Sequence, residues 1–389
     1  MTRIIIIIPD SLGIGELPDA DEYGDKGSNT LGNIKKTVDG FNIPNLEKLG
    51  IGNIDGITGF KKVSSPLASY ARMLEASKAK DTAAGHWEIA GIILDKPFPT
   101  FPNGFPEEIM KRFEAETGLD YLGNIPASGT EIIEKLGKEH LKTKKPIVYT
   151  SQDSVFQIAA HEDIIPVPRL YEICEITRRI ADDYNICRVI ARPFVGTLCS
   201  FKRTERRKDF SIAPIEETIL DKLKADGLHV IGIGKIGDIY GHRGLTEEIH
   251  TKDNMDGIHK TLGVMRKIQN GLIFTNLVDF DMLYGHRNDA EGYAKALMEF
   301  DAVLPEIIGL LKDSDMLIIT ADHGCDPTTP STDHSREYVP LLVYGKRLMG
   351  GINLGTRKTF ADIGQTVAEV FGLGKIKNGK SFLKPKLSD

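Results

Sequence analysis

The fold is decided by the stretch Ile4-Ile5-Ile6-Ile7-Ile8-Pro9-Asp10, a continuous apolar run that ends in a proline and a carboxylate. Short apolar runs of this kind are typical of strands that are buried on both faces of a parallel sheet. Four similar runs occur later in the chain, at His229–Ile233, Leu272–Val278, Met316–Thr320 and Val339–Tyr344. The sequence therefore predicts a sheet of buried strands.

The segments between these strands have the helical spacing of apolar residues. The clearest are Met255–Ile268, Ala290–Leu311 and Phe360–Phe371, the last of which ends before Gly372. Strands that alternate with helices indicate a mostly parallel sheet covered by helices on both sides. We therefore expect an α/β fold for this part of the chain.

The middle of the chain has a different pattern, which begins with a proline-rich stretch at residues 96–106 that is typical of a linker. Predicted helices follow at Glu107–Thr117, Thr130–Lys142 and Pro168–Asp182, with predicted strands at Ile147–Thr150 and Arg188–Ile190. We expect a discontinuous core domain, residues 1–97 and 216–389, and an inserted α+β domain at residues 98–215. The two crossings between them would form a hinge.

Composition excludes several classes of protein. The 389 residues include 49 Lys+Arg and 55 Asp+Glu, which gives a net charge of −6, and 41% are hydrophobic. This apolar fraction excludes wholesale disorder, and the negative charge argues against nucleic acid as a partner. Four cysteines without a Cys-x-x-Cys pair indicate a reducing compartment. No apolar stretch approaches the ~20 residues of a membrane span, so we expect a cytoplasmic protein, and nothing indicates an obligate protein partner.

Three of the predicted strands lead into the same residue types. Ile4–Ile8 leads to Asp10, Leu272–Val278 leads to Asp279, Asp281 and His286, and Met316–Thr320 leads to Asp322, His323 and His334. In open parallel sheets, ligands bind outside the carboxyl ends of the strands. Aspartate and histidine without cysteine suit Mn, Zn, Mg or non-haem Fe. Six ligands are too many for one catalytic ion with an open position, so the pattern favours two ions in one pocket.

Each of these residues also has a structural interpretation. An aspartate after a strand often forms a turn or caps a helix, and Asp-His-Gly can be a loop with a hydrogen-bonded histidine. Asp279 is expected to be structural, because it points away from Asp281 if the strand period persists. The convergence of three strand ends on one composition favours metal binding for the other six.

A nucleophile candidate lies in the segment Lys80-Asp-Thr-Ala-Ala-Gly-His-Trp-Glu88. Thr82 precedes a helix-like stretch, and the free N–H groups of a helix N-terminus favour anions such as phosphate. The alternative is that Thr82 or Asp81 merely caps that helix. A metal bound to the Thr82 hydroxyl would lower its pKa and make it a nucleophile. Trp87 is expected to pack beneath the helix.

The segment Gly232-Ile-Gly-Lys-Ile-Gly237 matches the Gly-x-Gly-x-x-Gly pattern of dinucleotide-binding proteins. That pattern requires a helix to open there, whereas the next residues include two more glycines and have no helical period. We expect a tight turn that brings Lys235 to the pocket, and no dinucleotide site.

Together these segments resemble the phosphopentomutases, a family of the alkaline phosphatase superfamily of metalloenzymes. The resemblance rests on Ile8-Pro-Asp-Ser-Leu-Gly-Ile-Gly-Glu16, Lys80–Glu88, Asp281-x-x-x-x-His286, Ala321-Asp-His-Gly-Cys-Asp-Pro327 and Thr332-Asp-His-Ser-Arg-Glu337. The string Asp-Thr-Ala-Ala-Gly-His-Trp-Glu is specific to this family, whereas Asp-His-Gly belongs to the whole superfamily. The resemblance implies an alkaline-phosphatase-like core with an inserted cap domain.

The resemblance also implies a metal-dependent phosphate transfer. Two Mn²⁺ ions are expected, although Mg²⁺ or Zn²⁺ can share such ligands. By analogy the first ion would be held by Asp281, His286 and His334, and the second by Asp10, Asp322 and His323. Thr82 would carry phosphate, primed by a sugar bisphosphate such as glucose 1,6-bisphosphate. The family interconverts ribose 1-phosphate and ribose 5-phosphate, and the 2-deoxyribose pair, through a pentose 1,5-bisphosphate.

By the same resemblance, four residues are expected to bind the pentose phosphate. Asp153 matches a carboxylate that reaches the sugar hydroxyls. Arg188, Arg203 and Lys235 match basic residues that meet the phosphate at the far end of the substrate, a role that the arginine fork suits geometrically. The other residues of the basic run at 202–208 are interpreted as solvated surface.

Other functions fit parts of this pattern. A cofactor-independent phosphoglycerate mutase has a serine nucleophile and a longer insert, so Thr82 and an insert of ~118 residues argue against it. A plain phosphatase would keep the metals without a closing domain. A non-enzymatic metal- or nucleotide-binding protein on a doubly wound sheet is the alternative from a different class, and fewer than two divalent ions per chain would favour it.

Overall fold

The computed structural model describes residues 2–151, 154–198 and 200–383, and the chain divides into two compact units. Unit 1 comprises Met1–Lys96 and Pro214–Asp389, and unit 2 comprises Pro97–Ala213. The sequence places the two crossings at 97/98 and 215/216, within two residues of these limits. Each unit has its own sheet and is described by itself.

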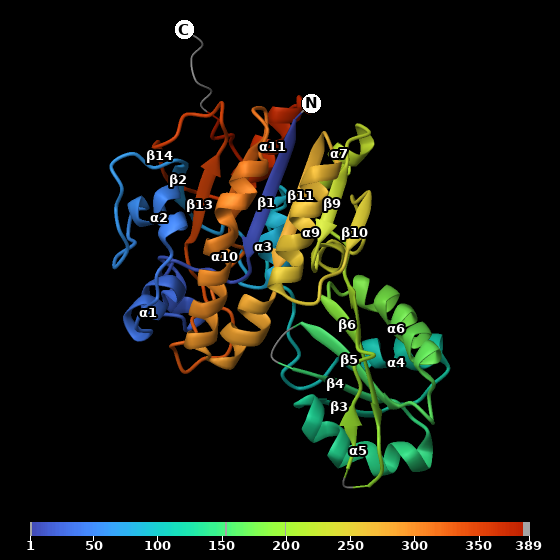
Figure 1. The fold of residues 1–389 in the computed structure, drawn as a ribbon. Helices are drawn as coiled ribbons and strands as arrows, with labels where there is room; N and C mark the ends of the chain where they lie inside the picture. Colours follow the sequence, from blue (N-terminus) through green and yellow to red (C-terminus); the bar gives the residue numbers. More distant parts are fainter. Residues whose placement is uncertain (1, 152–153, 199, 384–389) are drawn as a thin grey trace. The chain divides into compact units, whose positions relative to one another are not determined.

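Unit 1 is built on an eight-stranded sheet with the strand order β10-β9-β11-β1-β12-β13-β2-β14 (Figure 1). The strands are β1 (Arg3–Pro9), β2 (Ser69–Met73), β9 (Val230–Ile233), β10 (Glu247–Ile249), β11 (Gly271–Leu277), β12 (Met316–Thr320), β13 (Val339–Tyr344) and β14 (Asn353–Arg357). Neighbours are parallel except around β13, which is antiparallel to β12 and β2. The α/β fold with a mostly parallel sheet is therefore confirmed.

The isoleucine strand β1 lies in the middle of this sheet. Residues Ile4–Ile8 are at most 2% exposed. β1 pairs in parallel with β11, where Ile8 faces Asn276, and with β12, where Ile7 faces Ile319. Because these three strands run in one direction, their carboxyl ends meet at the same edge of the sheet.

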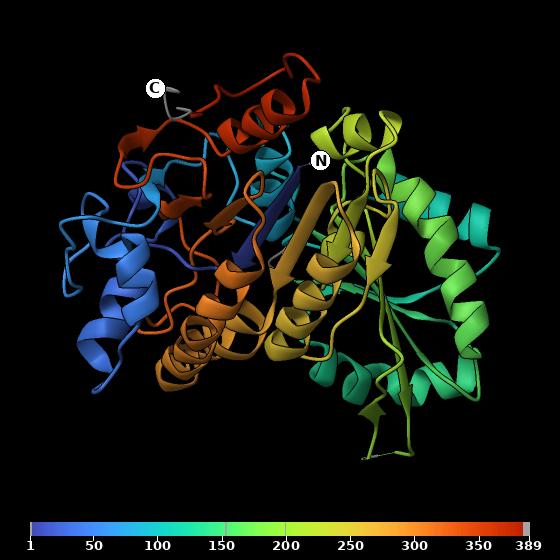
Figure 2. The same cartoon turned by 45° about the horizontal axis from the view of Figure 1, so that its top comes forward.

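Helices cover both faces of the sheet (Figures 1 and 2). α10 (Ala290–Leu310) packs against α1 (Thr30–Thr37), α2 (Pro44–Leu49) and α9 (Asn254–Lys267). α11 (Ala361–Phe371) packs against α3 (Thr82–Ile89) and α7 (Ile219–Ala225), and α3 also contacts α8 (Ile236–Ile239). The short helices are η1 (Ala20–Tyr23), η2 (Ile51–Asn53), η3 (Phe280–Tyr284) and η4 (Gly285–Arg287). Among the described residues, no helix is long and apolar enough to cross a membrane.

Helix α8 corrects one detail of the sequence interpretation. A helix does open after Gly234, where we expected only a turn, and Lys235 is its N-cap residue. The helix has a single turn of four residues, and the chain then passes through Gly241 and Gly244, both with positive φ. One turn is too short for the helix of the dinucleotide-binding pattern.

Unit 2 contains a mixed sheet with the order β3-β4-β5-β6-β7, and β8 also pairs with β6. Its strands are β3 (Leu122–Pro126), β4 (Ile147–Thr150), β5 (Val155–His161), β6 (Arg188–Val195), β7 (Lys202–Arg203) and β8 (Lys208–Ser211). α4 (Glu107–Thr117) and α6 (Val167–Asp182) enclose a core with Phe113, Phe156 and Ile173. α5 (Gly129–Thr143) packs on a second core with Ile132 and Tyr149.

The sequence missed several strands for identifiable reasons. β5 begins only five residues after the end of β4, so this second strand lies where the sequence suggests a loop after the first. β6 continues through Arg192 and Pro193, beyond its predicted end at Ile190. β2 alternates buried and half-buried residues, so it has no continuous apolar run.

A buried ion pair joins the amino ends of β1 and β12. Arg3 is fully buried, and its Nε donates to Asp315 Oδ2 at 3.0 Å while its Nη2 donates to the Leu310 carbonyl at 3.2 Å. Asp315 directly precedes β12. The pair therefore holds together the starts of two strands whose far ends carry the candidate ligands.

Replacing Asp315 by asparagine should lower the free energy of unfolding by about 3–5 kcal/mol, because Arg3 would keep a buried charge without its partner. The double variant Arg3→Met/Asp315→Leu should recover most of that loss. Denaturant unfolding measures both. The exposed pair of Lys26 and Asp21 is the control, since Lys26→Met should change stability by less than about 1 kcal/mol. An Asp315→Asn protein as stable as the parent would contradict this account.

Candidate metal centre

Six side chains gather at the carboxyl edge of β11, β1 and β12. Asp10 follows β1, Asp281 lies in η3 after β11, and Asp322 and His323 follow β12. His286 lies in η4, and His334 lies in the loop between β12 and β13. All six are the residues that the strand-end pattern predicted as ligands, and the parallel register brings them together from positions up to 324 residues apart.

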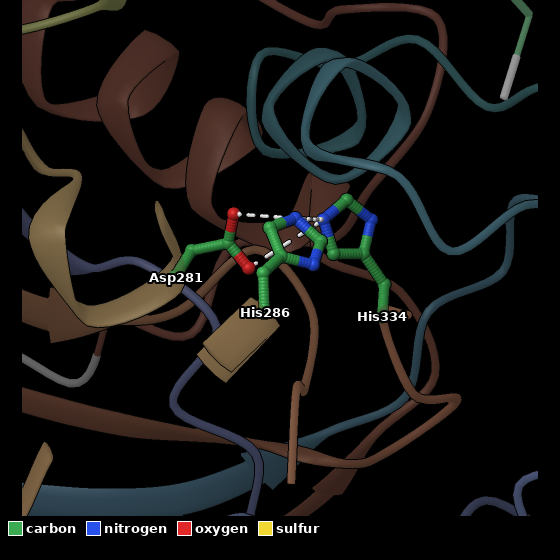
Figure 3. A group of neighbouring side chains, drawn as sticks. All are labelled: Asp281, His286 and His334. Atoms are coloured by element: carbon green, nitrogen blue, oxygen red, sulfur yellow. Dashed lines mark hydrogen bonds and ion pairs between the residues drawn. The ribbon is translucent and has the colours of Figure 1, made fainter. Parts of the chain in front are cut away.

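The first group consists of Asp281, His286 and His334, whose ligand atoms lie within 4.8 Å of one another (Figure 3). His286 Nε2 is 3.1 Å from Asp281 Oδ2, and His334 Nε2 is 3.5 Å from Asp281 Oδ1. The two Nε2 atoms are 3.2 Å apart. His286 Nδ1 donates to the Thr332 carbonyl at 2.7 Å, so its Nε2 keeps a free lone pair for a cation.

The second group consists of Asp10, Asp281 and His323. His323 Nε2 is 3.5 Å from Asp10 Oδ1 and 3.2 Å from Asp322 Oδ2. His323 Nδ1 donates to the Gly324 carbonyl at 3.0 Å, which again leaves Nε2 facing the carboxylates. Asp281 thus belongs to both groups, while Asp322 borders the second group through His323.

Carboxylate oxygens without a hydrogen-bond partner indicate that this pocket is suited to metal ions. Asp10 Oδ1, Asp281 Oδ1 and Asp322 Oδ2 are buried and have no hydrogen-bond partner. Each of them faces a histidine nitrogen at 3.2–3.5 Å. A buried charge without a partner is unfavourable unless a cation compensates it. The six side chains therefore fit two divalent ions.

Two other buried carboxylates nearby provide a contrast. Glu88 accepts five hydrogen bonds from its surroundings, including Ser77 N and Phe360 N. Glu337 accepts four, two of them from Thr30. Both of these carboxylates use both oxygens, so they hold the fold together. The unpaired oxygens are confined, among these five acids, to the three at the strand ends.

The acids of the pocket also affect one another's protonation. Burial and the carboxylates of Asp322 and Asp281 raise the pKa of Asp10 well above its usual value. Burial acts in the same direction on Asp281, but His334 and His286 outweigh it and hold the pKa of Asp281 well below its usual range. Like charges are thus crowded into one buried pocket, which bound divalent cations would relieve.

Residues that the sequence did not single out support the ligands. Asn276 Nδ2 donates to Asp10 Oδ2 at 2.7 Å, and Ser11 N donates to Asp322 Oδ1 at 3.1 Å. His86, fully buried, places Nδ1 2.9 Å from the Thr82 carbonyl and 3.2 Å from Asp322 Oδ2. In the sequence, the polar Asn276 within the apolar strand β11 is the feature that could have indicated these supporting residues.

Thr82 begins α3 and points its hydroxyl at the pocket. Asp81 is the N-cap, since its Oδ1 accepts hydrogen bonds from Ala83 N and Ala84 N, each at 3.1 Å. Capping is therefore the task of Asp81, and Thr82 Oγ1 lies 3.0 Å from His323 Nε2. Trp87 is fully buried and donates to the Ile239 carbonyl at 3.0 Å, as expected for a residue beneath this helix.

A glycine allows α3 to approach the ligand loop. A Cβ at Gly85 would lie 2.1 Å from the carbonyl oxygen of Asp322. Any other residue there would push the helix, and with it Thr82, away from the strand ends. The Gly-His pair of the motif is thus explained by close packing and by the contact of His86 with Asp322.

The predicted substrate residues are distributed over both units. Asp153 lies outside the described residues. Arg188, on β6, and Arg203, on β7, belong to the sheet of unit 2, and Arg188 Nη1 is 4.0 Å from Asp209 Oδ2. Lys235 belongs to unit 1, at the start of α8.

Replacing Asp322 or His334 by asparagine should remove about one of two bound ions, because each residue serves one side of the pocket. Metal analysis of purified protein by mass spectrometry measures this. Asp279→Asn is the matched control. Asp279 Oδ2 accepts a hydrogen bond from Asn254 N at 2.8 Å, which is a structural contact, so this variant should keep both ions. Two ions in every variant would contradict the ligand assignment.

Comparison with known proteins gives a long match. The family model described as the Metalloenzyme superfamily covers residues 2–375. A phosphopentomutase from Acetivibrio thermocellus is 62% identical over 384 residues, which are 98% of this chain and 99% of that protein. A phosphopentomutase from Kosmotoga olearia is 60% identical over 384 residues, with the same shares of both chains.

A solved structure agrees on the fold. A phosphoglycerate mutase from Leishmania mexicana matches with a TM-score of 0.50 and 10% identity, covering 98% of this chain and 97% of that one. At this identity the likeness concerns the fold alone. On the matches at 60% identity and above, the chain belongs to the phosphopentomutase family of the metalloenzyme superfamily.

Proposed function

We propose that the protein interconverts ribose 1-phosphate and ribose 5-phosphate, and the corresponding 2-deoxyribose phosphates, with Thr82 as the phosphate carrier. Membership of the family makes it a mutase, an isomerase that acts as an intramolecular phosphotransferase. The single observation that carries the proposal is the position of Thr82 Oγ1, 3.0 Å from His323 Nε2 within the cluster of metal-ligating groups.

Divalent metal ions suit the family and the two ligand groups. We assign one Mn²⁺ to Asp281, His286 and His334 and a second Mn²⁺ to Asp10, Asp322 and His323, with Mg²⁺ or Zn²⁺ able to use the same ligands. When bound, the two ions supply positive charge that stabilises the transferring phosphoryl group and the deprotonated Thr82 hydroxyl.

Residues of the chain orient the nucleophile for this transfer. Asp81 fixes the first turn of α3 through Ala83 N and Ala84 N. The backbone N–H of Thr82 has no partner among the described residues, so it is free to donate to a phosphate at the helix N-terminus. These groups hold the Thr82 hydroxyl in place before substrate arrives, which is the condition for in-line transfer.

The proposed reaction has two phosphate transfers. A sugar bisphosphate such as glucose 1,6-bisphosphate primes Thr82. The free hydroxyl of the pentose phosphate attacks the phosphorus of phospho-Thr82, the bond from phosphorus to Thr82 Oγ breaks, and pentose 1,5-bisphosphate forms. Thr82 Oγ then attacks the other phosphate of that intermediate, and the sugar oxygen leaves as the new hydroxyl. Phosphate is conserved throughout.

The inserted unit is proposed to bind the sugar and keep water out. A phosphothreonine open to water would be hydrolysed, which would turn the mutase into a phosphatase. We assign Asp153 to the sugar hydroxyls, and Arg188, Arg203 and Lys235 to the phosphate that is not being transferred, since arginine forks match phosphate geometry. The proposal requires pentose phosphates and the bisphosphate primer as small-molecule partners, in a cytoplasmic setting.

Thr82→Val should lower the rate of isomerisation on the order of 10⁴–10⁶-fold, because the shape of the side chain is kept and the nucleophilic oxygen is lost. Metal content and melting temperature should stay at the parent values. Thr82→Ser is the matched variant and should keep measurable turnover. Coupled assays with ribose 1-phosphate and a bisphosphate primer measure the turnover of the parent and of both variants. Mutase turnover by the Thr82→Val protein would show that Thr82 is not the phosphate carrier.

The primed, metallated protein should convert ribose 1-phosphate to ribose 5-phosphate with little release of inorganic phosphate. ³¹P NMR follows the substrate, the product and free phosphate in one sample. Stoichiometric release of phosphate would identify a phosphatase instead. Conversion of a glycerate phosphate in place of the pentose phosphate would identify the other mutase of this fold.

A further inference from the structure

Two segments of unit 1 that are far apart in the chain hold each other beside the candidate metal centre. The first, residues 75–82, leads into α3, and the second, residues 332–336, we call the histidine segment. Arg336 is only 3% exposed, and its Nη1 donates to the Ser77 carbonyl at 2.7 Å and to the Ala79 carbonyl at 2.6 Å. The segment that carries the proposed nucleophile is therefore fastened to the segment that carries a candidate ligand.

Lys80 makes a contact in the opposite direction, from the first segment to the second. Its Nζ donates to both carboxylate oxygens of Asp25, each at 3.1 Å, and lies 3.3 Å from Asp333 Oδ2. An ammonium group has three N–H donors, and three carboxylate oxygens lie within reach of this one. The Lys80 side chain, 20% exposed, is therefore held between two acids.

Both acids also bind backbone N–H groups of the histidine segment. Asp333 Oδ1 accepts from His334 N at 2.8 Å, and Asp25 Oδ2 accepts from Arg336 N at 2.9 Å. Lys80 thus bridges two carboxylates that fix the backbone at a candidate ligand and two residues beyond it. Hydrogen bonds to ionised groups are roughly twice as strong as those between neutral groups, so this bridge limits the movement of the backbone at His334.

The histidine segment orients two of the three side chains of the first group of candidate ligands. His334 belongs to the segment, and the Thr332 carbonyl accepts from His286 Nδ1 at 2.7 Å. This contact holds the ring of His286 with Nε2 turned to Asp281 Oδ2, 3.1 Å away. A displacement of the segment would therefore disturb both histidines together.

The second group of candidate ligands has supports of its own. Ser11 N donates to Asp322 Oδ1 at 3.1 Å, and Asn276 Nδ2 donates to Asp10 Oδ2 at 2.7 Å. Neither contact involves Lys80 or the acids that bind it. The two groups should therefore differ in how far they depend on this lysine.

We propose that Lys80 is a positioning residue for the metal ion of the first group. It acts through Asp25 and Asp333, which hold the backbone of the histidine segment and thereby both histidine ligands. The assignment of a metal ion to this group rests on the proposed function. Direct contact of Lys80 with a phosphate of the substrate is the alternative, and it is disfavoured because the three donors of Lys80 already face carboxylates.

Titration of the metal-free full chain with Mn²⁺, followed by calorimetry, tests this role without any assay of activity. In Lys80→Met, one of the two ions should bind about 10–100-fold more weakly, because a group that supports metal ligands is lost, and the other should change by less than about threefold. Lys80→Arg keeps the charge and should recover part of the lost affinity. Lys26→Met is the matched control and should bind both ions as the parent does, since Lys26 pairs with Asp21 at the surface.

Steady-state kinetics separate this role from a contact with the substrate. In Lys80→Met, kcat should fall at limiting Mn²⁺ and recover in excess Mn²⁺, with an unchanged KM for ribose 5-phosphate. Unchanged Mn²⁺ affinity, equal weakening of both ions, or a raised KM at saturating Mn²⁺ would each overturn the proposal. If Lys80→Met does not fold, Lys80→Gln, which keeps two N–H donors without the charge, should weaken the same ion. The expected pattern of Mn²⁺ binding in a chain without mutase activity would refute the proposed function and leave the role of Lys80 standing.

Discussion

Electrostatic repulsion among three buried carboxylates is the constraint on which the rest of this structure depends. The parallel strands β11, β1 and β12 end side by side, so Asp281, Asp10 and Asp322 are forced into one pocket. Each keeps an oxygen without a hydrogen bond, and such a buried charge is unfavourable unless a cation compensates it. The buried strands, held at their other ends by Arg3 and Asp315, supply the stability that such a pocket requires.

The proposed nucleophile, Thr82, is placed by the same crowding. α3 approaches the ligand loop closely enough that Gly85 touches the Asp322 carbonyl, and His86 lies between Thr82 and Asp322. Glu88, at the end of the motif, is fully hydrogen-bonded and ties α3 to the start of α11. One helical segment therefore carries both the Thr82 hydroxyl and the contacts that fix it, so a shift of α3 would disturb the candidate ligand Asp322 and the proposed nucleophile together.

Unit 2 differs in the placement of its charges, because arginines gather around its strands β6, β7 and β8. Arg188 and Arg207 are neutralised locally by Asp209, whereas Arg192 and Arg203 have no acid partner among the described residues. The net charge thus bears on the solubility of the whole chain, while the local charge at each site can have the opposite sign. The proposed reaction requires both kinds of site, one for the phosphate that is transferred and one for the phosphate that is not.

The isoleucines of β1 predicted the α/β fold, because strands buried on both faces must be apolar throughout. The residues after each strand predicted a cluster of candidate ligands, because parallel strands end at one edge of the sheet. The motif around Thr82 pointed to the family. Only the tertiary structure decided that Asp81 caps α3 while Thr82 faces the pocket, that Asp281 belongs to both candidate ligand groups, and that Asn276 and His86 contact the candidate ligands. Those relations depend on distances between side chains far apart in the chain, which strand register and packing determine and local sequence does not encode.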